Sequence, residues 1–244
     1  MIDIKFNFTT DTPNYWKNFW DNDMGHTHFD PDLKSKTLMK YHSILWSKRL
    51  PNGEDMHLTE GRGYLVWKDF SFGSDSITNS FRNKRNEKVM HKVMSCVQNY
   101  REFVENYLKE TNTIGGYVIF PKKRQSINQA RGCNYFIGDR FDLTLECIRR
   151  YYNNEQSPLY NTLVQNKDFF DLFSDFKGYV EFFLLQDIVD ENFKNIKFWL
   201  GEGMLDINPL PQSVEEYLTI IEKEIAFVKN RNERIKAYLN KTCM

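Results

Sequence analysis

Alternation of apolar and polar residues in the first third of the chain predicts β-strands. Residues 2–9 (IDIKFNFT) alternate in this way and carry β-branched or aromatic side chains, so we expect an opening strand there. Residues 55–60, 62–67 and 70–77 also have strand-like composition, with polar turns near them. Residues 117–120 (YVIF) are apolar at every position, which is typical of a central strand covered on both faces. The sequence therefore predicts a small mixed sheet.

A helical period of apolar residues dominates the rest of the chain. The longest such stretch, residues 84–109, predicts one continuous helix with a buried face. Ser213 and Glu216 form a capping box that opens a final helix. Helices and strands interleave without a break in composition, so we predict a single α+β domain over residues 1–244, with a helix-rich C-terminal half. Other helices are expected over residues 31–49, 139–152, 158–173 and 176–190, and a last short strand over residues 196–200.

Composition restricts the partners and the compartment. Lys and Arg together number 33, as do Asp and Glu, so a nucleic-acid partner would need a local basic patch. The 4 cysteines form no CxxC pair, and no signal peptide opens the sequence. The longest apolar runs are far shorter than the ~20 residues of a membrane span. We therefore expect a cytoplasmic protein with free thiols and no membrane partner.

A basic segment follows the apolar strand at residues 117–120. We expect residues 122–132 (KKRQSINQARG) to form a loop. Guanidinium groups bind phosphate or carboxylate with two hydrogen bonds, and amides add directional ones. A solvated charged loop is the alternative interpretation. The ligand-binding candidates in and after this segment are Arg124, Asn128, Arg131, Asn134 and Arg140.

Further candidates lie before this segment. His42 falls near the buried edge of a predicted helix, where it is either a hydrogen-bonded core histidine or a catalytic imidazole. Ser47 and Lys48 end that helix; both are ligand-binding candidates, although a cation there also suits the helix dipole. Ser74 and Ser76 flank an aspartate in a polar cluster that either lines a phosphate or sugar site or forms a turn.

Glu146 lies on the predicted helix at residues 139–152, on the side away from its apolar face. Arg149 and Arg150 follow it at helical spacing, which usually produces surface ion pairs. If this face lined a cleft, Glu146 would act as an acid, a base or a ribose-binding carboxylate.

A possible metal site precedes these candidates. His26 and His28 form an HxH pair, and Asp30 and Asp32 follow it. Imidazole and carboxylate groups bind divalent metals, although such clusters in surface loops usually hold none.

Several blocks of the sequence resemble a family of uncharacterised bacterial proteins, a domain of unknown function. The resemblance implies that the blocks belong to one domain, but it implies no activity. It covers about residues 30–192 and returns near residues 229–235; the blocks include YHSILWSKRLPNG, SINQARG and DRFDLTLECIRRYY.

The favoured functional hypothesis is an enzyme that acts on a nucleotide or nucleic acid. ADP-ribosyltransferases, which transfer ADP-ribose from NAD, use residues of similar types on a small α+β sheet, although the spacing here does not match theirs. His42 and Glu146 would then lie at the reaction centre, with the Arg and Asn side chains on the phosphates. A toxin or phage-defence role would suit such a bacterial enzyme.

Three alternatives stay open. The first is a non-catalytic module in which Arg124, Arg131 and Arg140 clamp a phosphate ligand or RNA, with Tyr135 or Phe136 stacking on bases. The second is a metal-dependent nuclease that uses the HxH segment. The third is a structural partner protein.

Overall fold

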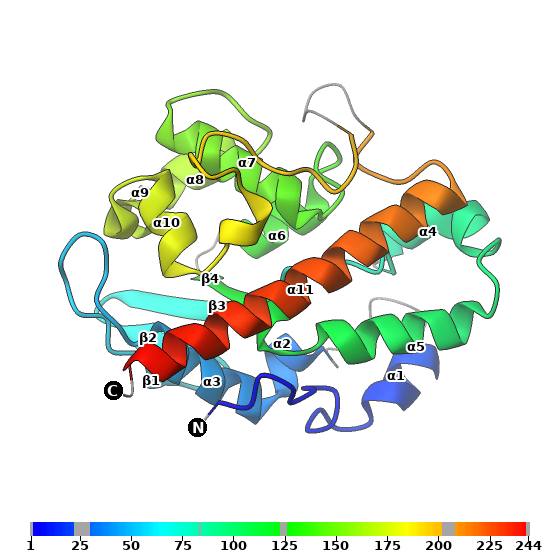
Figure 1. The fold of residues 1–244 in the computed structure, drawn as a ribbon, viewed down its shortest axis with the longest axis horizontal. Helices are drawn as coiled ribbons and strands as arrows, with labels where there is room; N and C mark the ends of the chain where they lie inside the picture. Colours follow the sequence, from blue (N-terminus) through cyan, green and yellow to red (C-terminus); the bar gives the residue numbers. More distant parts are fainter. Residues whose placement is uncertain (1, 22–29, 83, 123–125, 202–207, 243–244) are drawn as a thin grey trace.

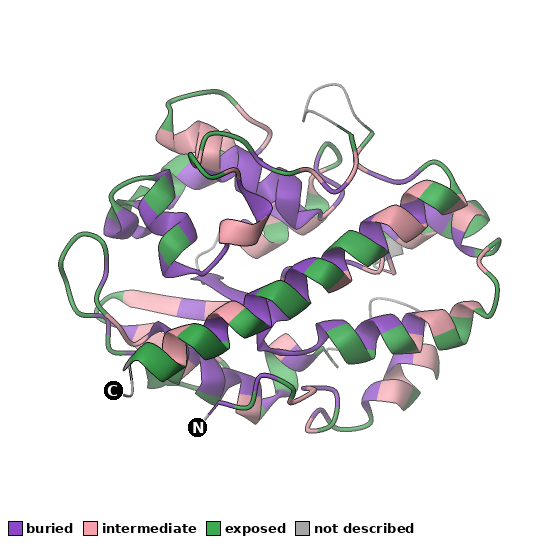
Figure 2. Cartoon of the chain, viewed as in Figure 1, coloured by how far each residue is buried: buried purple, intermediate pink, exposed green. Residues whose placement is uncertain are grey.

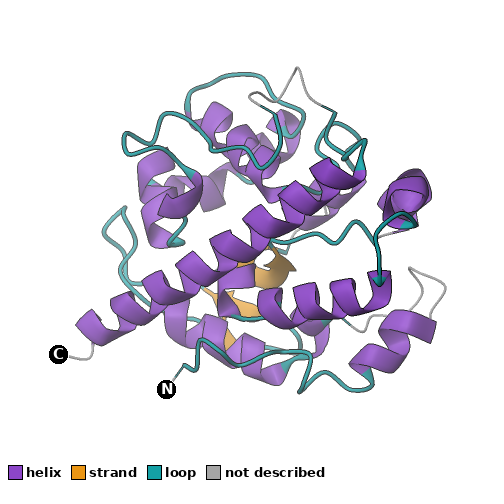
Figure 3. Cartoon of the chain, turned by 45° about the vertical axis from the view of Figure 1, so that its right-hand side comes forward, coloured by secondary structure: helices purple, strands orange, loops and turns teal. Residues whose placement is uncertain are grey.

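A four-stranded sheet lies at the centre of the fold, with helices around it. The computed structural model describes residues 2–21, 30–82, 84–122, 126–201 and 208–242. The strand order β1-β2-β3-β4 follows the chain, and every neighbouring pair is antiparallel. Figure 3 shows this small sheet behind and between the helices. The strands are β1 (Thr59–Glu60), β2 (Leu65–Trp67), β3 (Phe70–Ser76) and β4 (Tyr117–Pro121).

The helices in the described part of the chain are mostly short, apart from the last. Three 3-10 turns lie between them: η1 (Ile114–Gly116), η2 (Asp171–Phe173) and η3 (Gln186–Ile188). The helices are α1 (Tyr15–Asp21), α2 (Pro31–Lys34), α3 (Lys36–Trp46), α4 (Lys84–Met94), α5 (Tyr100–Thr111), α6 (Ile127–Cys133), α7 (Phe141–Tyr152), α8 (Tyr160–Gln165), α9 (Lys167–Phe170), α10 (Phe176–Phe182) and α11 (Val214–Thr242).

The long helix α11 crosses the whole molecule. In Figure 1 it runs diagonally between α5 on one side and the group of α7, α8 and α10 on the other, with α4 near its N-terminal end. Its outward face is exposed, while its inner face is buried, as Figure 2 shows. α11 packs against α5 and against η1, the turn that leads into β4. Helices from both halves of the chain therefore share one hydrophobic core.

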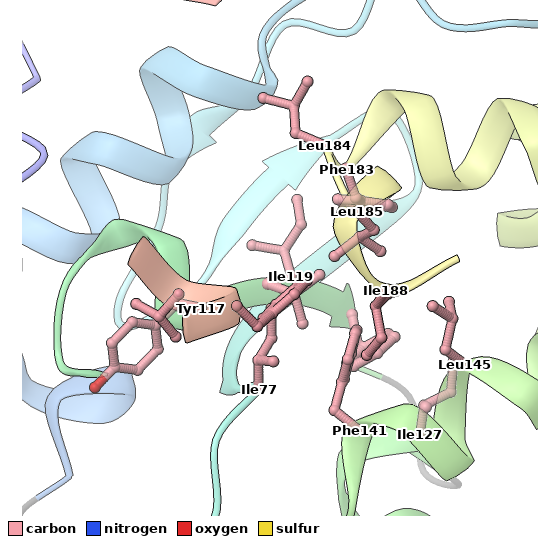
Figure 4. Packing of buried hydrophobic residues seen from close by; sticks show 14 of the residues in the cluster. Ile77, Tyr117, Ile119, Ile127, Phe141, Leu145, Phe183, Leu184, Leu185 and Ile188 are labelled. Carbon is pink, nitrogen blue, oxygen red and sulfur yellow. The ribbon is translucent and has the colours of Figure 1, made fainter. Parts of the chain in front are cut away.

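β4 is the last strand of the sheet, yet all five of its residues are buried. Figure 4 shows Phe183, Leu185 and Ile188, which follow α10, gathered beside Ile119 of β4, with Phe141 of α7 nearby. Burial of each such side chain contributes about 1.5–3 kcal/mol. The sequence predicted a central strand here; the strand is buried as expected, but helices cover its outer side instead of another strand.

Arg231 of α11 bonds β4 to the end of α10. Its guanidinium is fully buried and donates to the carbonyl oxygens of Gly115 and Tyr117, each at 2.8 Å. It also donates twice to the carbonyl oxygen of Phe183, at 3.2 and 2.9 Å. Burial lowers the pKa of Arg231 to about 9, so the group keeps its charge at neutral pH. One side chain thus satisfies three carbonyls from two separate segments, the η1–β4 stretch and the end of α10.

A second cation binds the same end of α10. Lys48 Nζ donates to the carbonyl oxygen of Phe182 at 2.6 Å and lies within 4.5–5.1 Å of the ring centres of Trp46, Phe182 and Tyr238. The helix dipole and the ring faces both favour a cation here. Burial, and then the charge of Arg231, lower the pKa of Lys48 to about 7.

The α+β class is confirmed, and so are several elements. The hairpin strands form inside the predicted ranges, although β1 and β2 are shorter than expected. Helix α7 forms, and Ser213 caps α11 by accepting from Glu216 N at 3.1 Å. The sheet is antiparallel rather than mixed. The predicted strands at residues 2–9 and 196–200 do not form, because their apolar side chains pack into the core while their backbones make only isolated bonds, such as Phe8 N to Asn112 O and one bridge from Ile196 to Val189.

Several helix predictions and one loop prediction also need correction. The helix expected over residues 158–173 divides into α8, α9 and η2, and the helix expected over residues 176–190 ends with α10 at Phe182, before η3. The stretch at residues 84–109 divides into α4 and α5, because Asn99 takes a left-handed conformation with φ of 48°. The helix expected over residues 31–49 divides at Ser35, whose hydroxyl caps α3 by accepting from Leu38 N. Part of the predicted basic loop is the helix α6, because Ser126 caps it in the same way.

Replacement of Arg231 by Met tests its role. Arg231→Met keeps most of the side-chain volume but leaves buried carbonyls without a donor, so we expect the free energy of unfolding to fall by about 3 kcal/mol or more. Arg234→Met is the control; it removes a partly exposed ion pair with Asp187 and should cost about 1 kcal/mol or less. Urea unfolding measures both, and equal losses would contradict the assigned role.

Candidate functional site

Side chains of α6 close the edge of β3 beyond the end of β2. β2 pairs with β3 only as far as Phe72, so the next carbonyls on that edge have no strand to bond. Asn128 Nδ2 donates to the carbonyl oxygen of Ser74 at 3.3 Å, and Arg131 Nη1 donates to that of Ser76 at 2.7 Å. Carbonyls two residues apart point to the same side of a strand, so these two side chains replace a missing strand. Both were expected to bind a ligand, and both instead bond the protein's own backbone.

Arg131 also holds two carboxylates. Its Nη1 lies 2.6 Å from Asp75 Oδ2, and its Nε lies 3.6 Å from Asp139 Oδ1. Nε also donates to Thr144 Oγ1, Nη2 donates to the carbonyl oxygen of Asp139, and the side chain is only 2% exposed. Burial raises the pKa of Asp75 and raises that of Asp139 to about 6, while Arg131 opposes both shifts. The guanidinium therefore favours the ionised forms of its two partners.

Asp32 is a third carboxyl in this region, on α2, which packs against β3. Its Oδ1 is buried and has no hydrogen-bond partner among the described residues. Burial, followed by the negative charges of Asp30 and Asp75, raises the pKa of Asp32 well above its ordinary value. Burial raises the pKa of both carboxyls, and Arg131 opposes the rise at Asp75. Of the two, Asp32 therefore holds its proton to the higher pH.

His42 is fully buried and engaged at both ring nitrogens. Trp46 Nε1 donates to His42 Nδ1 at 2.9 Å, so the proton of the neutral ring lies on Nε2. His42 Nε2 then donates to Ser74 Oγ at 2.9 Å. Burial, and then the charge of Arg231, lower the pKa of His42 to about 3. In this tautomer the ring cannot take a proton from Ser74, so it orients the hydroxyl instead of activating it.

The structure does not bring His42 and Glu146 together at one reaction centre. Glu146 accepts from Arg149 and Arg150, each at 2.7 Å, so its charge is neutralised on its own helix. Figure 1 places α7 above the sheet and α3 below it. The ion pairs that helical spacing suggested for Glu146, with Arg149 and Arg150, do form.

Two more predicted ligand-binding residues bond distant backbone. Arg140 is fully buried in an ion pair with Asp142 and also donates to the carbonyl oxygens of Leu200 and Pro209. Asn134 Nδ2 donates to the carbonyl oxygen of Pro158 at 3.2 Å. These side chains anchor loops and have little capacity left for a ligand.

The remaining candidates within the described residues also bond the protein's own backbone. Ser47 Oγ accepts from Leu58 N at 2.9 Å, Ser76 Oγ donates to the carbonyl oxygen of Thr78 at 2.8 Å, and Lys48 binds the end of α10. Arg124 lies outside the described residues.

The structure describes only part of the predicted metal site. His26 and His28 lie outside the described residues. The part of the chain that the structure describes contains no group of three or more His, Cys, Asp or Glu side chains arranged to hold a metal ion.

A surface pocket of about 440 Å³ lies away from all these residues, between the N-terminal segment, α5 and α11. Lys5, Lys109 and Lys229 line it together with Glu110 and Glu233, and Lys229 is already paired with Glu110 at 3.1 Å. Its charges are mixed, and it contains none of the candidate residues.

Sequence reasoning missed that Asp32 and Asp139 are buried carboxyls near Asp75. Asp32 was considered only as a metal ligand, and Asp139 only as the start of a helix. These two aspartates differ from the other aspartates in being buried near Asp75. Their burial depends on how α2 and α6 pack on β3, which no local pattern in the sequence shows. The polar triplet at residues 74–76, together with Asn128 and Arg131, pointed to this region.

The chain belongs to a family of unknown function (DUF6994), whose model matches residues 2–235. The resemblance to an uncharacterised family is therefore confirmed over nearly the whole sequence. No curated protein matches the chain, and neither does any solved structure. Within the described residues, no helix is long and apolar enough to span a membrane.

The tautomer of His42 can be measured directly. We expect ¹⁵N NMR at pH 5 to show a neutral His42 ring with its proton on Nε2, since its pKa is lowered to about 3. Trp46→Phe removes the donor to Nδ1 and should weaken this preference, while the exposed His57 and His91 serve as references in the same spectrum. A charged His42 at pH 5, or a proton on Nδ1, would refute the assigned geometry.

Proposed function

We propose that this member of the DUF6994 family is an enzyme that cleaves the N-glycosidic bond of a nucleoside or nucleotide. Asp32 would be the proton donor and Asp75 the ionised partner. The observation that carries the proposal is the buried Asp32 Oδ1, which has no hydrogen-bond partner among the described residues, beside a carboxylate that Arg131 holds. Pairs of carboxyls whose surroundings separate their pKa values are typical of acid–base sites.

The two carboxyls match the two needs of this reaction. When the bond between the sugar carbon and the base nitrogen breaks, the leaving base takes a proton, which Asp32 supplies. The sugar then carries an oxocarbenium-like positive charge, which the negative charge of Asp75 stabilises. A water or an acceptor hydroxyl attacks the sugar carbon, and its proton passes to an ionised carboxylate. The ionised Asp75 is the residue assigned to receive it.

Ser74 has a supporting role in this proposal. His42 donates to its hydroxyl oxygen, so the hydroxyl hydrogen stays available for a substrate oxygen. His42 thereby acts as a positioning residue rather than as a catalytic imidazole at the reaction centre.

The proposal also ranks substrates. Nicotinamide leaves NAD as a neutral molecule and needs no proton, whereas a purine or pyrimidine leaves best when protonated. A protonated Asp32 therefore favours ordinary nucleosides and nucleotides over the ADP-ribosyl transfer from NAD that the residue types suggested. Loss of nucleotide bases would still suit a toxin or phage-defence role.

Base release from nucleosides, nucleoside monophosphates and NAD, followed by chromatography, tests the proposal. We expect Asp32→Asn to lower kcat by about 10²–10⁴-fold, because general acid catalysis contributes that much. Activity of the native protein should fall as pH rises through the raised pKa of Asp32, since only the protonated form donates.

Glu146→Gln is the matched control, because it also removes one largely buried carboxylate, but one that two arginines already neutralise. It should keep the native kcat. A folded Asp32→Asn variant with full activity, or no base release from any of the substrates, would refute the proposed function.

A further inference from the structure

Two adjacent aromatic side chains in the loop between α6 and α7 are exposed to solvent. Tyr135 is 63% exposed and Phe136 is 69% exposed, the largest values among the big apolar side chains in the described part of the chain. Their rings lie 6.5 Å apart at an angle of 88°. Exposed aromatic rings of this kind usually mark a binding surface.

The loop that carries these rings is held firmly. Gly138, two residues after Phe136, has a φ of 57°, and its carbonyl oxygen accepts from Asn79 at 3.1 Å and from Asn86 at 3.0 Å. Asn134 Oδ1 accepts from Phe136 N at 2.9 Å. The aromatic pair is therefore positioned before any ligand arrives, which lowers the entropic cost of binding.

Helix α4 places a row of cations beside the aromatic pair. Arg85 lies 5.3 Å from the centre of the Tyr135 ring and donates to the carbonyl oxygen of Cys133. Lys88 and Lys92 follow Arg85 at i+3 and i+7, so they share its exposed face. Cys133 and Tyr135 lie about fifty positions from Arg85 in the sequence, so only the folded chain brings cations and rings together.

We propose that Tyr135, Phe136 and the exposed face of α4 form a docking surface for single-stranded nucleic acid. Bases stack on the two rings, and phosphates bind Arg85, Lys88 and Lys92. This surface replaces the clamp of Arg131 and Arg140 expected from the sequence, because both of those guanidiniums are buried and occupied. A single strand fits better than a duplex, since stacking on exposed rings requires unpaired bases. The inference goes beyond the proposed reaction and does not depend on it.

Fluorescence anisotropy with labelled 12-nucleotide single strands of RNA and DNA tests this surface. We expect Tyr135→Ala/Phe136→Ala to weaken binding about tenfold or more. Phe136→Leu keeps the apolar area but loses the aromatic face, so it should also weaken binding, whereas Phe136→Trp should retain it. The RNA and DNA arms show which strand is preferred, and a duplex competitor should bind less tightly than either.

Charge reversal provides the matched comparison. Lys88→Glu/Lys92→Glu should abolish most of the binding, and Lys88→Ala/Lys92→Ala should make the dependence of log Kd on log salt shallower by about 1.4. Lys36→Glu/Lys40→Glu changes the net charge equally, at the same i, i+4 spacing on the exposed side of α3, and should leave binding nearly unchanged. Asp32→Asn should also bind normally, which separates this surface from the reaction centre.

Three results would overturn the proposal. No measurable binding of either strand would do so, as would equal losses from the two charge reversals, since that would indicate a diffuse charge effect. Full binding by Phe136→Leu together with tighter binding of an apolar peptide than of RNA would indicate a protein-docking surface instead.

Discussion

The buried guanidinium of Arg231 is the contact on which the rest of the fold depends. It joins α11 to η1, β4 and the end of α10, using hydrogen bonds to carbonyls alone. A buried cation is costly unless its donors are satisfied. Helix α11, the η1–β4 stretch and the end of α10 must therefore meet at this point for any of them to be stable there. Once β4 is fixed, β3 is fixed beside it, and β3 carries Ser74 and Asp75.

The protein uses most of its predicted ligand-binding groups to bond itself. Arg131 and Asn128 replace a missing strand at the edge of β3, and Arg140 ties loops to α7. Side chains that have no partner inside the protein are therefore more informative about function than the buried arginines. The buried oxygen of Asp32 and the exposed rings of Tyr135 and Phe136 are features that internal bonding does not account for.

Local patterns in the sequence predicted the elements whose causes are local. The capping box at Ser213, the hairpin strands and the ion pairs of Glu146 all depend on residues within a few positions of one another. The opening segment at residues 2–9 does not form a strand, because its alternating apolar side chains pack into the core and none of the strands in the described residues pairs with it. The break at Asn99 depends on a left-handed residue that helical periodicity cannot show.

The candidate site was harder to predict, because tertiary contacts create it. Ser74 and Asp75 were recognised as a polar cluster, but the tautomer of His42 depends on Trp46, and the protonation of Asp32 depends on burial near Asp75. The expected meeting of His42 and Glu146 depended on a packing of helices that no spacing in the sequence encodes.

The protonation state of Asp32 is the central claim, and ¹³C NMR of aspartate labelled at the side-chain carboxyl measures it directly. At pH 7 we expect one carboxyl resonance at the position of a protonated acid, lost in Asp32→Asn and kept in Asp175→Asn. A spectrum in which Asp32 is ionised at pH 7 would contradict its role as a proton donor.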